Sequence, residues 1–96
     1  MEGKKRRQKI LIVDDNEMNR SILMDMLGDE YTVIEAVNGL HAVNELQKQA
    51  SDIDLVMLDL VMPEMDGLEV LAVMNQRRWI ESIPVIMISA ESTSDR

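Results

Sequence analysis

Acidic side chains follow two of the apolar segments in this sequence, and a hydroxyl group follows a third. Asp14 and Asp15 come after one segment, Asp59 after another, and Ser89 with Ala90 after the third. Carboxylates beside buried apolar segments are costly unless they have partners, and like charges held close together repel one another. A divalent cation would remove both problems. Mg²⁺ fits best because it takes oxygen ligands and keeps several waters, and Mn²⁺ is the alternative.

Asp59 is the best candidate for a nucleophile in this group. A carboxylate can attack a phosphoryl group to give an acyl phosphate, and such transfers depend on positioning and charge neutralisation. The cation would bridge Asp59 and the phosphoryl oxygens, and the Ser89 hydroxyl would donate a hydrogen bond to one of them. Asp14, Asp15 or Asn16 alone could instead cap a helix, but capping does not explain polar residues after three segments together.

The elements that would carry these residues are short strands alternating with helices. Strands are predicted at Ile10–Val13, Tyr31–Ala36, Leu55–Leu58 and Val85–Ile88, and helices at Met18–Leu27, Ala42–Ala50 and Leu68–Asn75. Strands that are continuously apolar are typical of a parallel sheet covered by helices on both faces. The carboxyl ends of such strands meet at one edge of the sheet, where ligands bind in these folds. The polar residues after the strands should therefore lie together.

The composition limits the other classes of function. The 96 residues suffice for one small domain, and without cysteine the chain has neither a disulfide nor a thiolate metal site. The single histidine, His41, is expected on a helix surface in solvent rather than as a metal ligand. No segment has the length of a membrane span or the form of a secretion signal, so a cytoplasmic location is expected.

Charge is distributed unevenly along the chain. Residues 1–9 hold five basic side chains and one acidic side chain, a net of +4, so the other 87 residues must carry −12 to reach the total of −8. The body should therefore repel nucleic acid and attract cations. We expect residues 1–8 to form a disordered basic tail and residues 9–96 to form the domain.

Four motifs together resemble the receiver domain of bacterial two-component response regulators. They are Ile-Leu-Ile-Val-Asp-Asp-Asn at 10–16, Leu-Val-Met-Leu-Asp at 55–59, Met-Pro-Glu-Met-Asp-Gly at 62–67 and Pro-Val-Ile-Met-Ile-Ser-Ala at 84–90. The resemblance covers residues 9–96. It implies a flavodoxin-like α/β fold, a three-layer αβα sandwich whose parallel sheet has the strand order 2-1-3-4-5.

The resemblance also implies a function and its residues. A histidine kinase or histidine phosphotransfer protein would supply the phosphoryl group from a phosphohistidine, and Asp59 would accept it in a domain that is not otherwise an enzyme. Mg²⁺ would be bound by Asp14 or Asp15, by Asp59 and by the backbone carbonyl of Val61. The Ser89-Ala90 pair would hydrogen-bond the phosphoryl group as the switch.

The sequence departs from the family pattern after the fourth strand. The family's fifth strand, its last helix and the lysine after strand five are not found in these 96 residues, so we expect a longer native protein. Of the basic residues, only Arg20 and Arg96 should lie on the site's side of the sheet, and neither belongs to a motif. Ile86, Ile88 and part of the first helix should be exposed. Such an edge favours a homodimer or an exchange of elements between chains.

Three alternatives remain open. A haloacid-dehalogenase-type phosphatase needs a second Asp two residues after the first, where this chain has Val61. A flavodoxin-like flavin binder needs a Ser/Thr/Gly-rich phosphate loop after the first strand, where this chain has Asp14 and Asp15. The third alternative, which the missing lysine favours, is an interaction module that binds partners or metal without phosphotransfer.

Overall fold

Residues 7–88 are described by the computed structural model, and they form four strands, three α-helices and three 3-10 turns. The strands are β1 (Gln8–Val13), β2 (Tyr31–Ala36), β3 (Leu55–Asp59) and β4 (Val85–Ile88). The helices are α1 (Glu17–Leu27), α2 (Gly39–Gln49) and α3 (Gly67–Gln76), and the turns are Gly28–Glu30, Ala50–Asp52 and Trp79–Glu81. Neighbouring strands pair in parallel in the order β2-β1-β3-β4, which confirms the predicted fold class.

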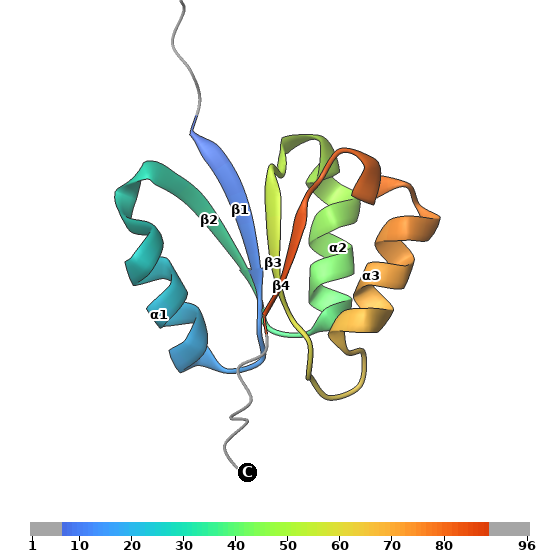
Figure 1. Ribbon diagram of the computed structural model, residues 1–96, viewed down its shortest axis with the longest axis horizontal. Helices are drawn as coiled ribbons and strands as arrows, with labels where there is room; N and C mark the ends of the chain where they lie inside the picture. The colour runs from blue at the N-terminus through green and yellow to red at the C-terminus, as the bar shows by residue number, and fades with distance from the viewer. Residues whose placement is uncertain (1–6, 89–96) are drawn as a thin grey trace, which may run out of the picture.

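The sheet separates the helices into two layers. Figure 1 shows α1 on one face of the sheet and α2 with α3 side by side on the other. Successive side chains of a strand point to opposite faces, so each strand divides its residues between these layers. In β1, Leu11 and Val13 join the core cluster that includes residues of α2 and α3, whereas Ile10 and Ile12 are buried outside that cluster. Burial on both faces is what a central parallel strand requires.

Each helix begins with a polar cap at the carboxyl end of the sheet. The side chains of Asn16, Asn38 and Asp66 accept hydrogen bonds from backbone N–H groups in the first turns of α1, α2 and α3. Such caps satisfy donors that the first helical turn leaves unpaired. They also fix where each strand-to-helix connection leaves the sheet. These connections form the edge on which the predicted site residues lie.

Strand β1 starts one residue before the predicted domain boundary, because Gln8 already pairs with Tyr31 of β2. Arg7 precedes the strand and is exposed, whereas residues 1–6 of the predicted basic tail lie outside the described residues, as does the segment 89–96. The expectations of a disordered tail and of a polar pair after β4 therefore stay predictions.

Apolar side chains are exposed on one surface, as the sequence predicted. Met18, Ile22 and Met26 of α1 are 71%, 50% and 75% exposed, and Ile86 of β4 is exposed as well. Ile88 was also expected to be exposed, but it is half-buried, because it lies beside Ile22 and Leu23 of α1. Among the described residues, β4 is an edge strand of the sheet. We refer to the four exposed residues as the α1–β4 surface.

Candidate functional site

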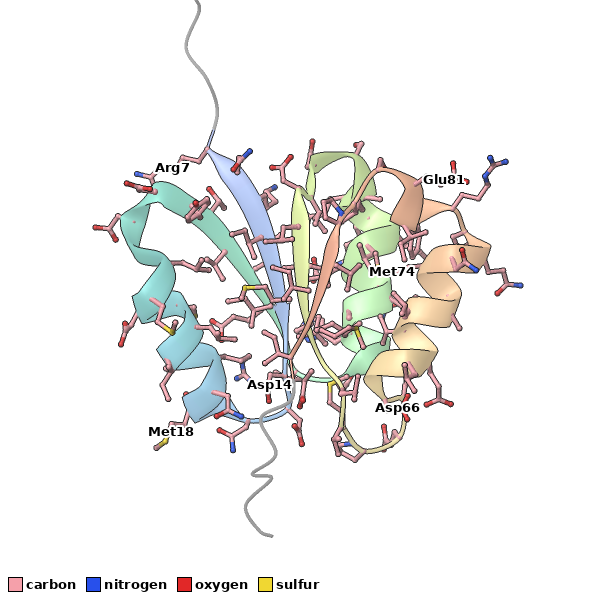
Figure 2. The ribbon with its side chains drawn as sticks, in the orientation of Figure 1. Arg7, Asp14, Met18, Asp66, Met74 and Glu81 are labelled. Carbon is pink, nitrogen blue, oxygen red and sulfur yellow. The ribbon has the colours of Figure 1, made fainter. Side chains whose placement is uncertain are left out.

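Three carboxylates named from the sequence gather at the carboxyl end of the sheet. Asp14 and Asp15 follow β1, Asp59 is the last residue of β3, and β1 and β3 are neighbouring strands. One oxygen atom from each of these carboxylates lies within 4.8 Å of the others. Figure 2 shows Asp14 at the same end of the molecule as Met18 and Asp66, the end at which the helices begin. We refer to the three aspartates as the acidic cluster.

Two of the three carboxylates are removed from water. Asp14 is 2% exposed and Asp59 is 4% exposed, whereas Asp15 is exposed. Burial raises the pKa of the Asp59 carboxyl, and the charges of Asp14 and Asp15 raise that pKa further. A hydrogen bond from the Val61 N–H to Asp59 Oδ1, 3.3 Å long, acts in the opposite direction. The acidic cluster therefore resists carrying all of its negative charge without a cation.

The backbone and side chain of Asp14 are both held in place. Its N–H donates to the carbonyl of Ala36 at the end of β2, at 3.1 Å. Its Oδ1 accepts from the Asn16 N–H at 2.9 Å, and its carbonyl accepts from Arg20 Nη1 at 2.8 Å. Hydrogen bonds of this kind restrict where the carboxylate can point. Asp14 is thus a preorganised member of the acidic cluster.

The acidic cluster fits a divalent cation that prefers oxygen ligands. Bonds of about 2.1 Å to Mg²⁺ place opposite ligands about 4.2 Å apart, so small side-chain rotations suffice to bring oxygens within 4.8 Å of one another onto one ion. Three carboxylates also supply the negative charge that a divalent ion offsets. The chain has no cysteine, and the described residues that gather here do not include His41, so the donors are carboxylate oxygens.

The start of α3 packs against the backbone of Asp59. The Gly67 N–H donates to the carbonyl of Leu60 at 3.1 Å. A Cβ atom at Gly67 would overlap the carbonyl oxygen of Asp59 and would lie 2.9 Å from the Cα of Leu60. A side chain at this position would therefore push α3 away from the last residue of β3. The sequence motif contained Gly67, but its spacing alone gave no reason for glycine.

The predicted roles of Ser89 and Ala90 lie outside the described residues. Ile88, the last described residue before them, lies beside the acidic cluster. Ile88 pairs with Asp59, and the Ile88 carbonyl accepts a hydrogen bond from the Leu60 N–H at 2.9 Å. Arg96, named as one of two cations on this side of the sheet, is also outside the described residues. These roles stay predictions.

Arg20 is the functional candidate that sequence reasoning underrated. It was placed on the correct side of the sheet but had no motif to support it. In the structure it is buried, and its Nε donates to Glu35 Oε1 at 2.8 Å. A partial signal was present, because Glu35 is a charged residue in an otherwise largely apolar strand. The buried guanidinium group of Arg20 needs a partner of opposite sign, which Glu35 supplies.

His41 belongs to the start of α2 and not to the acidic cluster. Its Nδ1 accepts from the Val37 N–H at 3.2 Å, and its Nε2 lies 3.5 Å from a carboxylate oxygen of Glu45. Its side chain is partly exposed. These contacts agree with the expected role of a solvated helix residue.

Comparison with known proteins gives one consistent family. The family described as response regulator receiver domain matches residues 10–96. The chemotaxis protein CheY of Halobacterium salinarum is 46% identical over 63 residues, which cover 65% of this chain and 51% of that protein. A two-component response regulator-like protein of rice is 34% identical over 86 residues, which cover 88% of this chain and 11% of the rice protein. The chain thus spans about half or less of these two relatives.

Solved structures agree with the sequence match. A CheY-like receiver domain from Methanospirillum hungatei has a TM-score of 0.78 at 26% identity, over 94% of this chain and 71% of that one. CheY of Borrelia burgdorferi, solved in a CheX-CheY-BeF3-Mg+2 complex, has a TM-score of 0.77 at 32% identity, over 91% of this chain and 65% of that one.

The relatives come from a plant and from archaea as well as from bacteria, so the expected bacterial origin stays a prediction. The family match, the parallel sheet order and the solved receiver structures all point to the same assignment. The chain belongs to the response regulator receiver domain family of two-component systems.

Proposed function

We propose that Asp59 accepts a phosphoryl group from a phosphohistidine, with Mg²⁺ or Mn²⁺ held by the acidic cluster. The observation that carries this proposal is the approach of one oxygen from each of Asp14, Asp15 and Asp59 to within 4.8 Å. Enzymatic and non-enzymatic phosphoryl transfer both depend on positioning and on neutralisation of charge. A receiver domain with this cluster at the end of its sheet supplies both.

The roles follow from the contacts of each residue. The Val61 N–H holds Oδ1 of Asp59, so we assign the attack on phosphorus to Oδ2. The new bond is an acyl phosphate, and the bond from phosphorus to the donor histidine breaks with its electron pair left on the imidazole. Asp14, Asp15 and the backbone carbonyl of Val61 complete the proposed ligand set. When bound, the cation offsets the charge of the carboxylates and of the phosphoryl oxygens.

The switch is proposed for the Ser89-Ala90 pair. The support for this proposal is the position of Ile88, which ends β4 beside Asp59. We propose that the Ser89 hydroxyl donates a hydrogen bond to the phosphoryl group once Asp59 carries it. The domain is then an acceptor that changes state, and its only chemistry is its own phosphorylation and dephosphorylation.

The proposed partner is a histidine kinase or a histidine phosphotransfer protein. Three exposed apolar side chains offer a partner surface around the acidic cluster: Met18 at the start of α1, Leu68 at the start of α3 and Val61 in the loop between β3 and α3. The net charge of −8 disfavours nucleic acid as the partner. Within residues 7–88 no helix combines the length and hydropathy that a membrane crossing needs. We propose that the phosphotransfer takes place in the cytoplasm.

We also propose that the 96-residue chain self-associates through the α1–β4 surface. Four apolar side chains are exposed there, and among the described residues β4 has a neighbour on one side only. Edge strands and contiguous apolar surfaces favour pairing with another chain. Either simple dimerisation or exchange of elements between two copies would cover this surface.

Phosphorylation by a small-molecule donor tests the acceptor role. The chain is incubated with acetyl phosphate, with and without Mg²⁺, and its intact mass is measured. We expect the mass gain of one phosphoryl group in the presence of Mg²⁺, and no gain without Mg²⁺ or in Asp59→Asn. Absence of the gain in the unsubstituted chain, at saturating Mg²⁺, would favour the alternative of an interaction module that binds partners or metal without phosphotransfer.

A further inference from the structure

Arg20 is a buried cation on an otherwise exposed helix. It is 8% exposed, and within α1, all of which the structure describes, it is the one residue that is buried. Removal of a guanidinium group from water is unfavourable unless its donors find good acceptors. The acceptors that Arg20 has found therefore indicate what its burial achieves.

One acceptor lies on β2 and the other on the residue that follows β1. Arg20 Nε donates to Glu35 Oε1 on β2, and Arg20 Nη1 donates to the carbonyl of Asp14 at the end of β1, both at 2.8 Å. The residue after Glu35 is Ala36, whose carbonyl accepts from the Asp14 N–H at 3.1 Å. Arg20 and β2 thus fix the peptide groups on both sides of Asp14. A closed ring of hydrogen bonds surrounds the backbone of one member of the acidic cluster.

The ring extends to the side chain of Asp14 through the start of α1. The Arg20 N–H donates to the carbonyl of Asn16 at 3.1 Å, and the Asn16 N–H donates to Asp14 Oδ1 at 2.9 Å. The side chain of Arg20 therefore binds the backbone carbonyl of Asp14. The main-chain N–H of Arg20 binds the turn that holds the Asp14 carboxylate. The side chain of Arg20 attaches the first turn of α1 to β2 and to Asp14, and a shift of that turn would loosen both contacts.

We propose that Arg20 is a positioning residue that holds Asp14 in place for cation binding by the acidic cluster. This inference rests on the proposed function, because the cation site is part of that function. An ion pair with Glu35 alone would serve to attach α1 to the sheet. The second bond, to the Asp14 carbonyl, is what links the attachment of α1 to the geometry of the site.

Arginine is suited to this role because its planar guanidinium group presents donors in two fixed directions. Nε binds Glu35 of β2 and Nη1 binds the carbonyl of Asp14, which follows β1, at the same time. The single ammonium group of lysine is a point charge on a flexible stem and lacks that fork. Arg20→Lys should therefore keep the charge while weakening the positioning.

Titration with Mn²⁺ alone, followed by calorimetry or electron paramagnetic resonance, measures the effect on the site. Residues that orient metal ligands typically contribute about 10–100-fold to metal affinity, so we expect Arg20→Met to raise the Kd for Mn²⁺ at least tenfold. Arg20→Lys should give an intermediate value. Glu35→Gln should stay within about threefold, because the amide oxygen still accepts from Nε. Arg78→Met is the matched control, because Arg78 makes a comparable but exposed pair with Glu81.

Amide hydrogen exchange of the metal-free protein gives a second readout. In Arg20→Met we expect the Asp14 and Asn16 amides to exchange about tenfold faster than in the unsubstituted chain, with Leu58 in the core unchanged. If Arg20→Met fails to fold, Arg20→Lys and Glu35→Ala carry the same test with a smaller expected change.

Two outcomes separate this inference from the proposed function. Failure of the unsubstituted chain to bind Mn²⁺ would contradict the proposed cation site. Hydrogen exchange at the Asp14 and Asn16 amides of Arg20→Met would still show whether Arg20 holds Asp14 in place. Conversely, normal Mn²⁺ binding and unchanged exchange in a folded Arg20→Met variant would show that Arg20 only attaches α1, and the inference would be wrong.

Discussion

The two faces of the sheet are built by different means. Figure 1 shows α2 and α3 on one face of the sheet. On that face, fully buried side chains such as Leu46, Met74 and Leu58 form one continuous apolar cluster. On the opposite face, α1 exposes Met18, Ile22 and Met26, and its one buried residue is the charged Arg20. One face is therefore fixed by a large apolar cluster, and the other by the buried Ile10 and Ile12 of β1 together with polar contacts close to the site.

The difference shows how the acidic cluster is supported. Asp59 ends a strand whose inner side chains belong to the apolar cluster, and Gly67 packs the start of α3 against its backbone. Asp14 instead depends on hydrogen bonds that come from α1 and β2. Regions with few buried apolar contacts open locally at low free energy. We therefore expect the Asp59 side of the cluster to be the more rigid and the Asp14 side to be the more adjustable.

The largest expected effect is on the packed face. Leu46→Ala removes a fully buried side chain and should lower the free energy of unfolding by about 2–5 kcal/mol. Ile22→Ala on α1 is the matched control, since the side chain is half-exposed, and it should change that free energy by no more than about 0.5 kcal/mol. Urea denaturation measures both. Equal losses would mean that the two faces are equally packed, and the comparison would fail.

A smaller effect is expected where the packed face meets the site. Gly67→Ala would place a Cβ against the carbonyl of Asp59 and should cost about 1–3 kcal/mol of stability. Gly28→Ala is the control, because Gly28 caps the C-terminal end of α1, whereas the site lies at the N-terminal ends of the helices. Gly28 has a φ of 72°, and the backbone strain of an alanine there costs a similar amount of stability, about 1–3 kcal/mol. We expect only Gly67→Ala to weaken Mn²⁺ binding as well. A similar loss of Mn²⁺ affinity in both variants would argue against specific support of Asp59 by Gly67.

The exposed face leads to a prediction on association. If two copies pair through the α1–β4 surface, Ile86→Lys should raise the dimer dissociation constant at least tenfold, or about 1.4 kcal/mol. Sedimentation over a range of concentrations measures this, and Leu68→Lys, at an exposed position on α3, is the matched control. A well-folded monomer at high concentration of the unsubstituted chain would contradict the proposed self-association.

The smallest effect concerns charge in the acidic cluster. The pKa of Asp59 is raised by burial and by its acidic neighbours, so the folded protein binds this proton more tightly than the unfolded chain does. The metal-free protein should therefore lose stability as the pH rises from the ordinary carboxylate pKa through the raised pKa of Asp59. Asp59→Asn should remove this slope and add on the order of 1 kcal/mol at neutral pH. Thermal unfolding in a chelator at several pH values measures the effect, and a slope unchanged by Asp59→Asn would contradict it.

Most of the fold could be predicted because the signals are local. The apolar run Ile10–Val13 and its counterparts predicted buried parallel strands, and the polar residues directly after them predicted the edge at which Asp14 and Asp59 meet. The exposure of part of α1 was also predicted. Local patterns of this kind report on one element and its immediate neighbours.

The support of the site could not be predicted in the same way. Arg20 acts through Glu35, which lies on a different element, and through a backbone carbonyl that has no sequence signal. Gly67 is required by the close approach of α3 to Asp59, which depends on the packing of two elements. Both roles arise from tertiary contacts, so the spacing of residues along the chain does not reveal them.

The central claim is that the phosphoryl group is carried by Asp59 and by no other carboxylate of the cluster. The most direct test treats the chain with acetyl phosphate and Mg²⁺, reduces it with sodium borohydride, and maps its peptides by tandem mass spectrometry. Reduction converts an aspartyl phosphate to homoserine, so we predict homoserine at position 59 and unmodified aspartate at positions 14 and 15. Homoserine at either of those two positions, or at none of the three, would contradict the claim.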